Sequence, residues 1–372
     1  MLGDAQAPRA AGNCVRAVPL ALVGCCCAVA GCSVSKRPVV SPPLVSKAPA
    51  VPSVAQRGPA GNCDPVLTRA VVETQRAFVA VRDERLRRGI TIDPRVDPVS
   101  SGLIGVSRTP ITTVRGNLVA KQASVNAAFA AVIVEMLRAA GVRPGDAVAV
   151  GLSGSFPALN IASLAAIEAL GAQPLAISSV GASTWGANHP RLTWPAMEKL
   201  LVQRSILRHR SIGASRGGAQ DIAKKRSEAA KRLMDQLIQD TGLTPIAARA
   251  FRQRVEARMA LYRQHAAGRK IAAYINVGGV TTSVGGSVGK RAFSPGLNTR
   301  FPVDEPLTDG VIVRFSRSGV PAIHLVQIRA LARQYRLPVH PAATLDFGRS
   351  PLRGQICTHD RQAARLCAHQ AC

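Results

Sequence analysis

Aromatic residues are scarce in this chain. Phe, Tyr and Trp together make up 3% of its 372 residues, whereas 47% of the residues are hydrophobic. Proteins that read single-stranded nucleic acid stack the bases on aromatic side chains, so this composition argues against that class. The apolar fraction also excludes a chain that is disordered throughout, because such chains combine low hydrophobicity with high charge. We therefore expect a folded protein with a substantial core.

Acidic residues are also few. The 21 Asp and Glu residues face 48 Lys and Arg residues, which gives a formal net charge of +27. Most of the cations are arginines, whose planar guanidinium pairs bidentately with carboxylates and phosphates. Two interpretations stay open, a compositional bias of the whole sequence or an anionic partner. The stretch 201–270 carries sixteen basic and five acidic residues. This excess indicates either solvated helix faces or an extended cationic surface that binds an anionic polymer.

No cysteine occurs between Asp64 and Ile356. This interval therefore offers no thiol nucleophile and no internal disulfide framework. The nine cysteines lie near the two ends of the chain: Cys14, Cys25, Cys26, Cys27, Cys32, Cys63, Cys357, Cys367 and Cys372. The Cys and His residues of the tail match no common zinc-binding spacing, and we predict no metal site.

The first 35 residues predict an export signal. Arg9 and Arg16 precede the uncharged stretch 17–35, and basic residues before a short apolar segment are typical of a signal peptide or signal-anchor. The motif Val-Ala-Gly-Cys resembles a bacterial lipobox and makes Cys32 the residue to be lipidated; a second match ends at Cys25. An uncleaved transmembrane anchor remains an alternative, since about 20 apolar residues span a bilayer. A mis-assigned start codon with a meaningless leader is a third.

We expect four parts in the chain. They are a membrane-targeting segment (1–35), a Pro-rich tether (36–62), a folded domain (63–347) and a basic, disordered tail (348–372). Proline favours extended backbone, so the tether would hold the domain off the membrane. The bulk of the chain is then expected on the extracytoplasmic side of a membrane.

Alternating helical and strand patterns predict an α/β fold, with a mostly parallel sheet covered by helices on both faces. The apolar runs that we interpret as strands are 147–151, 175–178, 271–277, 311–315 and 322–325. Helical patterns cover about 65–88, 126–140, 157–170, 194–200, 228–241, 246–266 and 328–335. The succession of strand, Gly/Ser loop, helix and strand from 147 to 178 is a βαβ unit, whose crossover is right-handed.

Small and polar residues follow the predicted strands at their carboxyl ends, where ligands of parallel α/β proteins bind. The candidate ligand-binding residues are Ser153, Gly154, Ser155, Ser178, Ser179, Ser183, Trp185, Asn188, Asn276, Gly278 and Gly279. The loop 153–155 precedes a helix that begins at Pro157, so its amides and hydroxyls can cradle a phosphate or carboxylate. A simple tight turn for this loop, and plain loop packing for Trp185 and Asn188, remain alternatives.

The sequence assigns no catalytic residue and no cofactor. Residues 285–289 match G-x-S-x-G in letters, but no apolar helix follows them, and the motif requires a strand, a turn and a helix. No Ser/His/Asp set can be assembled from the residues near the predicted cleft.

Four segments resemble, in order, the poly-γ-glutamate system protein family. They are GDAVAVGLSGSFPALN (145–160), ISSVGASTWGAN (177–188), AYINVGG (273–279) and PGLN (295–298). The similarity extends from about Arg85 to about Pro338 and includes 101–105 and 110–113. It weakens between 205 and 231, and the tail after Phe347 does not resemble the family. The resemblance implies a membrane-associated component of poly-γ-glutamate synthesis and export.

The resemblance also implies the partners. We expect the chain to bind poly-γ-glutamate or an anionic precursor in the Ser/Gly-lined cleft, alongside other membrane components of that system and not nucleic acid. The alternative is a transferase or hydrolase that acts on γ-glutamyl polymer in the same cleft. The family supplies no reaction mechanism, so the choice between the two stays open here.

Overall fold

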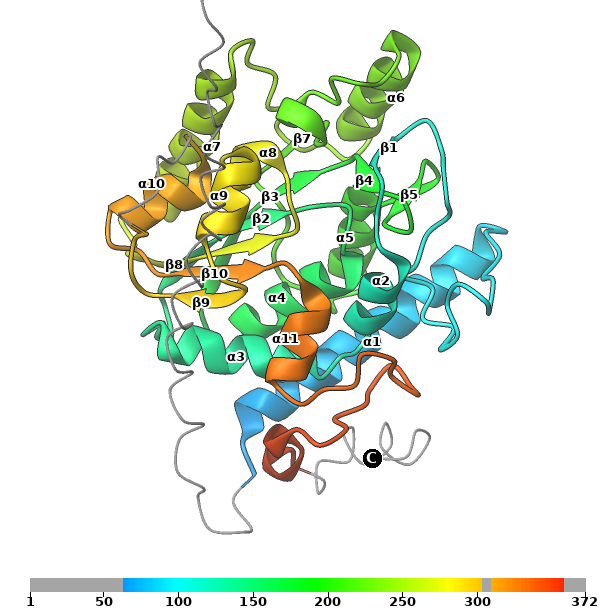
Figure 1. Ribbon diagram of the computed structural model, residues 1–372, viewed down its shortest axis with the longest axis vertical. Helices are drawn as coiled ribbons and strands as arrows, with labels where there is room; N and C mark the ends of the chain where they lie inside the picture. The colour runs from blue at the N-terminus through cyan, green and yellow to red at the C-terminus, as the bar shows by residue number, and fades with distance from the viewer. Residues whose placement is uncertain (1–62, 303–308, 358–372) are drawn as a thin grey trace, which may run out of the picture. The chain divides into compact units, whose positions relative to one another are not determined.

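A computed structural model describes residues 63–302 and 309–357 of the chain (Figure 1). The chain divides into two units, 1–47 and 48–372, and the described residues belong to the second. This unit is built on a six-stranded sheet in the order β7-β3-β2-β8-β10-β9. The strands are β2 (Ala147–Leu152), β3 (Gln173–Ser179), β7 (Gly213–Ser215), β8 (Ile271–Val277), β9 (Gly296–Asn298) and β10 (Ala322–Leu325).

The order of the strands reverses beside β2. The chain passes from β2 to β3 and β7 on one side, then returns to pair β8 with the other side of β2. All neighbouring strands pair in parallel except β9, which runs antiparallel to β10 at the edge. In open parallel sheets, ligands bind beyond the carboxyl ends of the strands at such a reversal.

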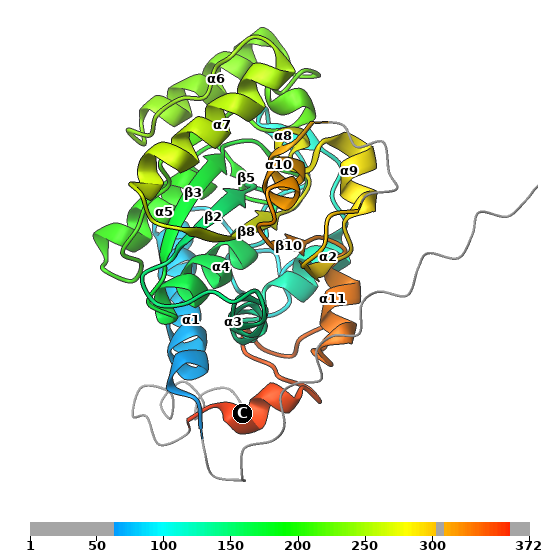
Figure 2. The same ribbon diagram turned by 90° about the vertical axis from the view of Figure 1, so that its left-hand side faces the viewer.

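Helices cover both faces of the sheet, as Figure 2 shows. Alternate residues of β2 point to opposite sides: Val148 and Val150 join one apolar cluster, and Ala147 and Ala149 join the other. The first cluster packs under α1 (Pro65–Arg87), α3 (Phe129–Ala139), α4 (Pro157–Ala169), α5 (Trp194–Gln203) and α11 (Ile328–Gln334). The second packs under α7 (Phe251–Ala266) and α10 (Val311–Arg317). The predicted α/β class with a mostly parallel, helix-covered sheet is confirmed.

Smaller elements complete the unit. Two-stranded pairs form between β1 (Thr112–Val114) and β4 (Ala182–Ser183), and between β5 (Asn188–His189) and β6 (Leu192–Thr193). The remaining helices are α2 (Leu118–Ser124), α6 (Glu228–Gln239), α8 (Thr281–Val284) and α9 (Gly286–Ala292), with 3₁₀ turns at Ala219–Asp221 and Pro351–Gln355.

The prediction of a strand at 311–315 is wrong, because these residues form most of α10. Val311, Ile312 and Val313 are all buried, and an apolar run this short fits a buried helix as well as a strand. Two features favour the helix. Arg314 reaches Asp309 at 2.7 Å, and the sheet position beside β10 is taken by β9. The three-residue strands β7 and β9 were not predicted, because so few residues carry no periodicity.

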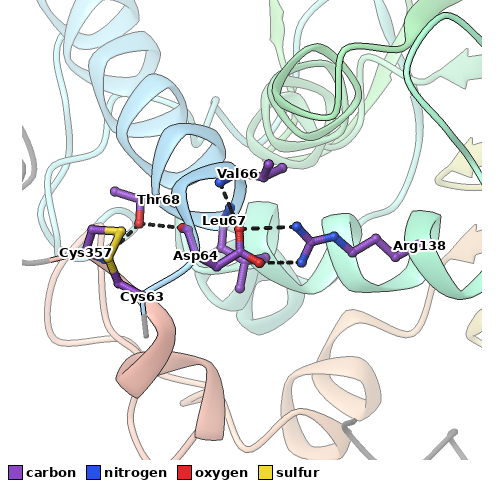
Figure 3. Close-up of a disulfide and its surroundings, with 7 residues drawn as sticks. All are labelled: Cys63, Asp64, Val66, Leu67, Thr68, Arg138 and Cys357. Atoms are coloured by element: carbon purple, nitrogen blue, oxygen red, sulfur yellow. Dashed lines mark hydrogen bonds and ion pairs between the residues drawn. A yellow bond between two sulfur atoms is a disulfide. The ribbon is translucent and has the colours of Figure 1, made fainter. Parts of the chain in front are cut away.

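The first residues of the tail that we predicted as disordered, 348–357, instead pack on the domain. Cys357 forms a disulfide with Cys63 across 294 residues, with their Cα atoms 4.7 Å apart (Figure 3). The Cys357 N–H donates to Thr68 Oγ1 at 2.8 Å, and Leu352 is buried. The bridge flanks the cysteine-free interval and ties the end of the domain to its first helix. The predicted segments 1–35 and 36–62, Cys32, and the tail from 358 onward lie outside the described residues.

α1 begins at the same point. The Asp64 carboxylate caps the helix by accepting from the N–H groups of Val66 and Leu67, at 2.8 and 3.2 Å. It also pairs with Arg138 of α3 at 2.6 Å (Figure 3). One residue therefore starts α1, anchors it to α3 and follows the disulfide directly.

Within 63–302 and 309–357, no single helix has the length and apolar character of a membrane span. Only α2 and α3 together reach both, and they meet at a bend of 79°.

We predict that Cys63→Ser and Cys357→Ser each lower the free energy of unfolding by roughly 3–5 kcal/mol, because the bridge restricts a long loop of the unfolded chain. Guanidinium denaturation of the full chain measures this. Cys367→Ser serves as the matched control and should leave the midpoint unchanged. A reductant that destabilises the Cys63→Ser/Cys357→Ser double variant as much as the wild type would contradict the assignment.

Candidate functional site

The loops that follow β2 and β8 meet at the reversal of strand order. The backbone at Gly278 has a φ of +82°, and a Cβ there would lie 3.1 Å from Ser153 Cβ. Glycine is therefore required for the two loops to lie this close. The structure thus brings together Ser153 and Gly278, which the sequence placed on different strands.

The loop 153–155 is a compact turn into α4. The Ser155 N–H donates to Ser153 Oγ at 3.1 Å, and Asn160 Nδ2 donates to the Ser153 carbonyl at 2.9 Å. The Gly154 N–H points to Ser179 Oγ at 3.4 Å. Phe156 precedes α4 and supplies no side-chain cap within the described part of the chain. The first-turn amides of α4 therefore make the positive end of a helix at this edge.

Ser183 joins this turn from the next loop. Its N–H donates to Ser155 Oγ at 3.0 Å, so the second predicted serine loop does lie against the first. Above Ser183 passes the segment 114–116, since a Cβ on Gly116 would lie 3.0 Å from Ser183 Oγ. Ser153 and Ser183 are both buried and Ser155 is half-buried.

Lys121 is the functional residue that the sequence did not reveal. It lies on α2 and only 2% of it is exposed. Its Nζ donates to Ser183 Oγ at 2.9 Å and to the Ser155 carbonyl, and it lies 3.6 Å from the centre of the Phe156 ring. Burial lowers the pKa of this amine from 10.5 to about 7. None of its contacts among the described residues is a carboxylate. The sequence of α2 is a short mixture of polar and apolar residues, so it does not indicate that its lysine is buried.

Ser178 does not lie in the site. Its side chain points to the face of the sheet opposite to that of Ser179. There its Oγ lies 2.6 Å from Ser211 Oγ and accepts from Trp194 Nε1 at 2.8 Å. Ser211 in turn donates to the carboxylate of Glu198 at 2.8 Å. Burial raises the pKa of Glu198 to about 7. Alternation along β3 separates Ser178 from Ser179, which remains at the loop.

Asn188 and Trp185 fasten the loop that covers the site. Asn188 accepts from the Val106 N–H at 3.0 Å and donates to the Val106 carbonyl at 2.7 Å and to Thr112 Oγ1 at 3.0 Å. Trp185 pairs its backbone with the same loop, because its N–H donates to the Val106 carbonyl at 2.9 Å. The structure therefore gives both residues contacts that position the 105–112 loop.

Asn276 shapes the turn after β8. Its Nδ2 donates to the Gly278 carbonyl at 2.6 Å and lies 3.1 Å from His324 Nδ1. Burial lowers the pKa of His324 to about 4, so the imidazole is neutral near pH 7 and serves Asn276 as an uncharged partner. Gly279 is exposed beside this turn.

The basic stretch 201–270 is not one continuous cationic surface. Arg254 and Arg258 are buried. Arg258 pairs with the equally buried Asp221 at 2.7 Å, and both hydrogen-bond to Ser215 Oγ at 2.7 Å. Arg216 is paired with Asp235 at 2.6 Å. Part of this charge therefore holds β7 and α7 together instead of facing solvent.

The carboxyl edge itself is strongly cationic. Its loops and first turns are 105–121, 153–157, 179–190, 215–223, 278–292 and 326–329. Their one acidic residue is Asp221, which is buried against Arg258. Their cations are Arg108, Arg115, Lys121, Arg216, Lys290, Arg291 and Arg329. In the residues that the structure describes, neither Arg108, Arg115 nor Lys290 forms an ion pair. Among the described residues these three cations therefore have no acidic partner, whereas Arg216 is paired with Asp235.

A groove with a volume of about 780 Å³ lies elsewhere, between α1, α5 and α6. Arg88 and Arg191 line it, and each donates to the backbone carbonyl of the other. Their guanidinium groups are thus already engaged in holding α1 to the loop before β6.

Family models, curated proteins and solved structures were compared with this chain, and none of them matches it. The site is therefore interpreted from its own residues.

We predict that Lys121→Met makes the protein more stable at neutral pH. The folded-state pKa of about 7 lies below that of the unfolded lysine, so folding must release a proton or bury a charge. This cost is largest below pH 7 and fades as the pH rises toward 10. The variant should exceed the wild type by about 2–4 kcal/mol at pH 7.

Guanidinium denaturation between pH 6 and pH 10 measures this difference. Lys270→Met is the matched control, because Lys270 is exposed; its stability difference should not change with pH. A Lys121→Met gain that is equal at pH 7 and pH 10 would contradict a buried amine.

We predict that Arg258→Met lowers the free energy of unfolding by about 3–5 kcal/mol, because it leaves the buried Asp221 carboxylate without its ion-pair partner. The double variant Arg258→Met/Asp221→Leu should recover most of that loss. Arg263→Met, which removes an exposed pair with Glu256, should cost less than about 1 kcal/mol. Equal losses for the single and the double variant would show that packing, and not charge, explains the effect.

Proposed function

We propose that this chain is a membrane-tethered component of a poly-γ-glutamate synthesis and export system, and that it binds the polymer or an anionic precursor at the carboxyl edge of the sheet. The observation that carries the proposal is the charge of this edge. Several exposed cations surround it, and the one acidic residue of its described loops, Asp221, is buried in an ion pair.

The arrangement suits a chain of carboxylates better than a single small anion. Arg108 lies on the 105–112 loop, Arg115 lies in the segment 114–116, and Lys290 lies on α9, near the turn after β8. A Cβ on Gly279 would lie 3.7 Å from Lys290 Nζ, so this cation stands over the β8 turn. Cations spread over loops from different strands can each meet a carboxylate of an extended polymer.

The disulfide supports an extracytoplasmic location for the domain. Bridges such as Cys63–Cys357 form and persist in oxidising compartments and are rare in the cytosol. This agrees with the export signal expected in 1–35 and with the tether expected in 36–62. The leader remains a lipoprotein signal with Cys32 modified or, alternatively, a transmembrane anchor.

A transferase or hydrolase that acts on γ-glutamyl polymer is the second candidate function. The hydrogen bond between Lys121 and Ser183 favours it, because a buried amine beside a hydroxyl is a recognised way to activate a serine.

We predict that the full chain binds fluorescent oligo-γ-glutamate, and that Arg115→Gln/Lys290→Gln weakens the affinity roughly 3- to 20-fold, since exposed ion pairs each contribute up to about 1 kcal/mol. Fluorescence anisotropy at several salt concentrations measures this. Affinity should fall as salt rises.

Lys270→Gln is the matched control, because Lys270 precedes β8 and so lies at the opposite end of that strand. Its affinity should equal that of the wild type. An equal loss with Lys270→Gln, or binding that persists unchanged at high salt, would contradict binding at the carboxyl edge. Tighter binding of a DNA oligonucleotide than of oligo-γ-glutamate would contradict the proposed polymer.

A further inference from the structure

Resting on the proposed function, we infer that Ser183 and Lys121 form a catalytic pair that cleaves the γ-amide bond of a bound γ-glutamyl chain, with Ser183 Oγ as nucleophile and Lys121 Nζ as general base. The substrate class is an amide that carries a carboxylate beside each linkage.

The pair is built by two separate elements. Lys121 projects from α2, and Ser183 ends the short strand β4. Their Nζ and Oγ atoms lie 2.9 Å apart, which is within the reach required between a nucleophile and its base. The Ser155 carbonyl and the Phe156 ring fix Nζ from two other directions. The amine is thus held on the serine by the turn that begins α4.

The surroundings favour the uncharged form of this amine. Burial brings its pKa to about 7, so a large share of it is neutral at physiological pH and its lone pair can accept the Ser183 proton. The acidic residues of the segment packed on α2 are occupied elsewhere. Asp97 accepts from Ser101 and Gly102, and Asp93 pairs with Arg95. Asp346, whose segment contacts Asn126 just after α2, accepts from the N–H groups of Ala342 and Gly348. The cations and His on the neighbouring described segments are Arg108, Arg115, His189, Arg329 and Arg333.

The reaction balances with water as the second substrate. Ser183 Oγ attacks the γ-carbonyl carbon while its proton moves to Lys121 Nζ. The C–N bond then breaks, and Lys121 returns that proton to the leaving amine, which leaves a γ-glutamyl ester on Ser183. Water attacks the ester, one water proton passes to Nζ, the C–Oγ bond breaks and the proton returns to Oγ. The products are one carboxylic acid and one amine. An acceptor amine in place of water gives transfer.

The helix beside the pair suits the charge that develops. Ser155, whose carbonyl meets Lys121, stands two residues before Pro157, where α4 begins. The positive end of this helix therefore lies close to the pair, and on the proposed mechanism its dipole favours the negative charge of the tetrahedral intermediate.

The segment 114–116 closes over the serine. The Gly116 N–H donates to Thr184 Oγ1, and the Thr184 N–H donates to the Val114 carbonyl at 3.0 Å. These contacts exclude water from Ser183, and the segment must be displaced for the chain to enter. Gly116 permits the close passage, since a Cβ there would lie 2.4 Å from the Thr184 carbonyl oxygen.

The test incubates the full chain with an oligo-γ-glutamate of defined length and follows the products by mass spectrometry. We expect cleavage by the wild type, a loss of at least 100-fold in kcat with Ser183→Ala and with Lys121→Met, and unchanged oligomer affinity for Ser183→Ala. Below pH 7 the rate should fall about tenfold per pH unit, because only the neutral amine accepts the proton. Ser163→Ala is the matched control, since Ser163 is a buried serine of α4; it should retain full activity.

A second readout does not depend on the polymer. A fluorophosphonate probe should label Ser183 with loss of fluoride, and Lys121→Met should abolish the label. Cleavage by Ser183→Ala at the wild-type rate would overturn the pair. Polymer binding without cleavage and without a Ser183 adduct would overturn it while leaving the proposed function intact. A Ser183 adduct without polymer binding or cleavage would retain the reactive pair but overturn both its assigned substrate and the proposed function.

Discussion

β2 pairs in parallel with β3 on one side and with β8 on the other, so two chain segments leave the carboxyl edge in opposite directions from neighbouring strands. This pairing sets the position of everything that the site contains. It places the Ser153 turn against Gly278, and the crossover to β3 brings Ser183 onto Ser155. The covering loop and α2 then add the cations and Lys121. Without the reversal beside β2, the first turn of α4 would face no second loop.

The strands and loops of this edge could be predicted from the sequence more fully than its side-chain contacts. β8 and β10 have the predicted bounds, and Ser153 and Gly278 meet as strand-end residues should. Ser178 was wrongly placed in the site, because successive side chains along a strand point to opposite faces and Ser178 precedes Ser179 by one residue. Lys121 was missed for a different reason: its meaning lies in burial beside Ser183, which only tertiary packing creates. α10 was misjudged because its first five residues, four apolar ones and Arg314, are too few to show a distinguishing period.

The fold separates two groups of basic residues, those buried in the core and those exposed at the carboxyl edge. Arg258 and Arg254 belong to the packing of α7, where a buried pair with Asp221 replaces part of an apolar core. Arg108, Arg115 and Lys290, at the carboxyl edge, form no ion pair among the described residues. A compositional bias explains a high arginine content, but it does not explain why the described loops of this edge carry several cations and one acidic residue, which is buried. This asymmetry is what favours an anionic ligand.

Binding and catalysis make opposite demands on Lys121. A carboxylate nearby favours the protonated amine, whereas a general base must be neutral. Burial is the cause of its lowered pKa, and on the proposed mechanism the displacement and closure of the segment 114–116 shift this balance. When this segment is displaced, water reaches the amine and its pKa rises, which helps to attract an anionic chain. When the segment closes again, the desolvated amine loses its proton and can act on Ser183. On the proposed mechanism, the exposed arginines and Lys290 hold the carboxylates, so that Lys121 is left free for the hydroxyl.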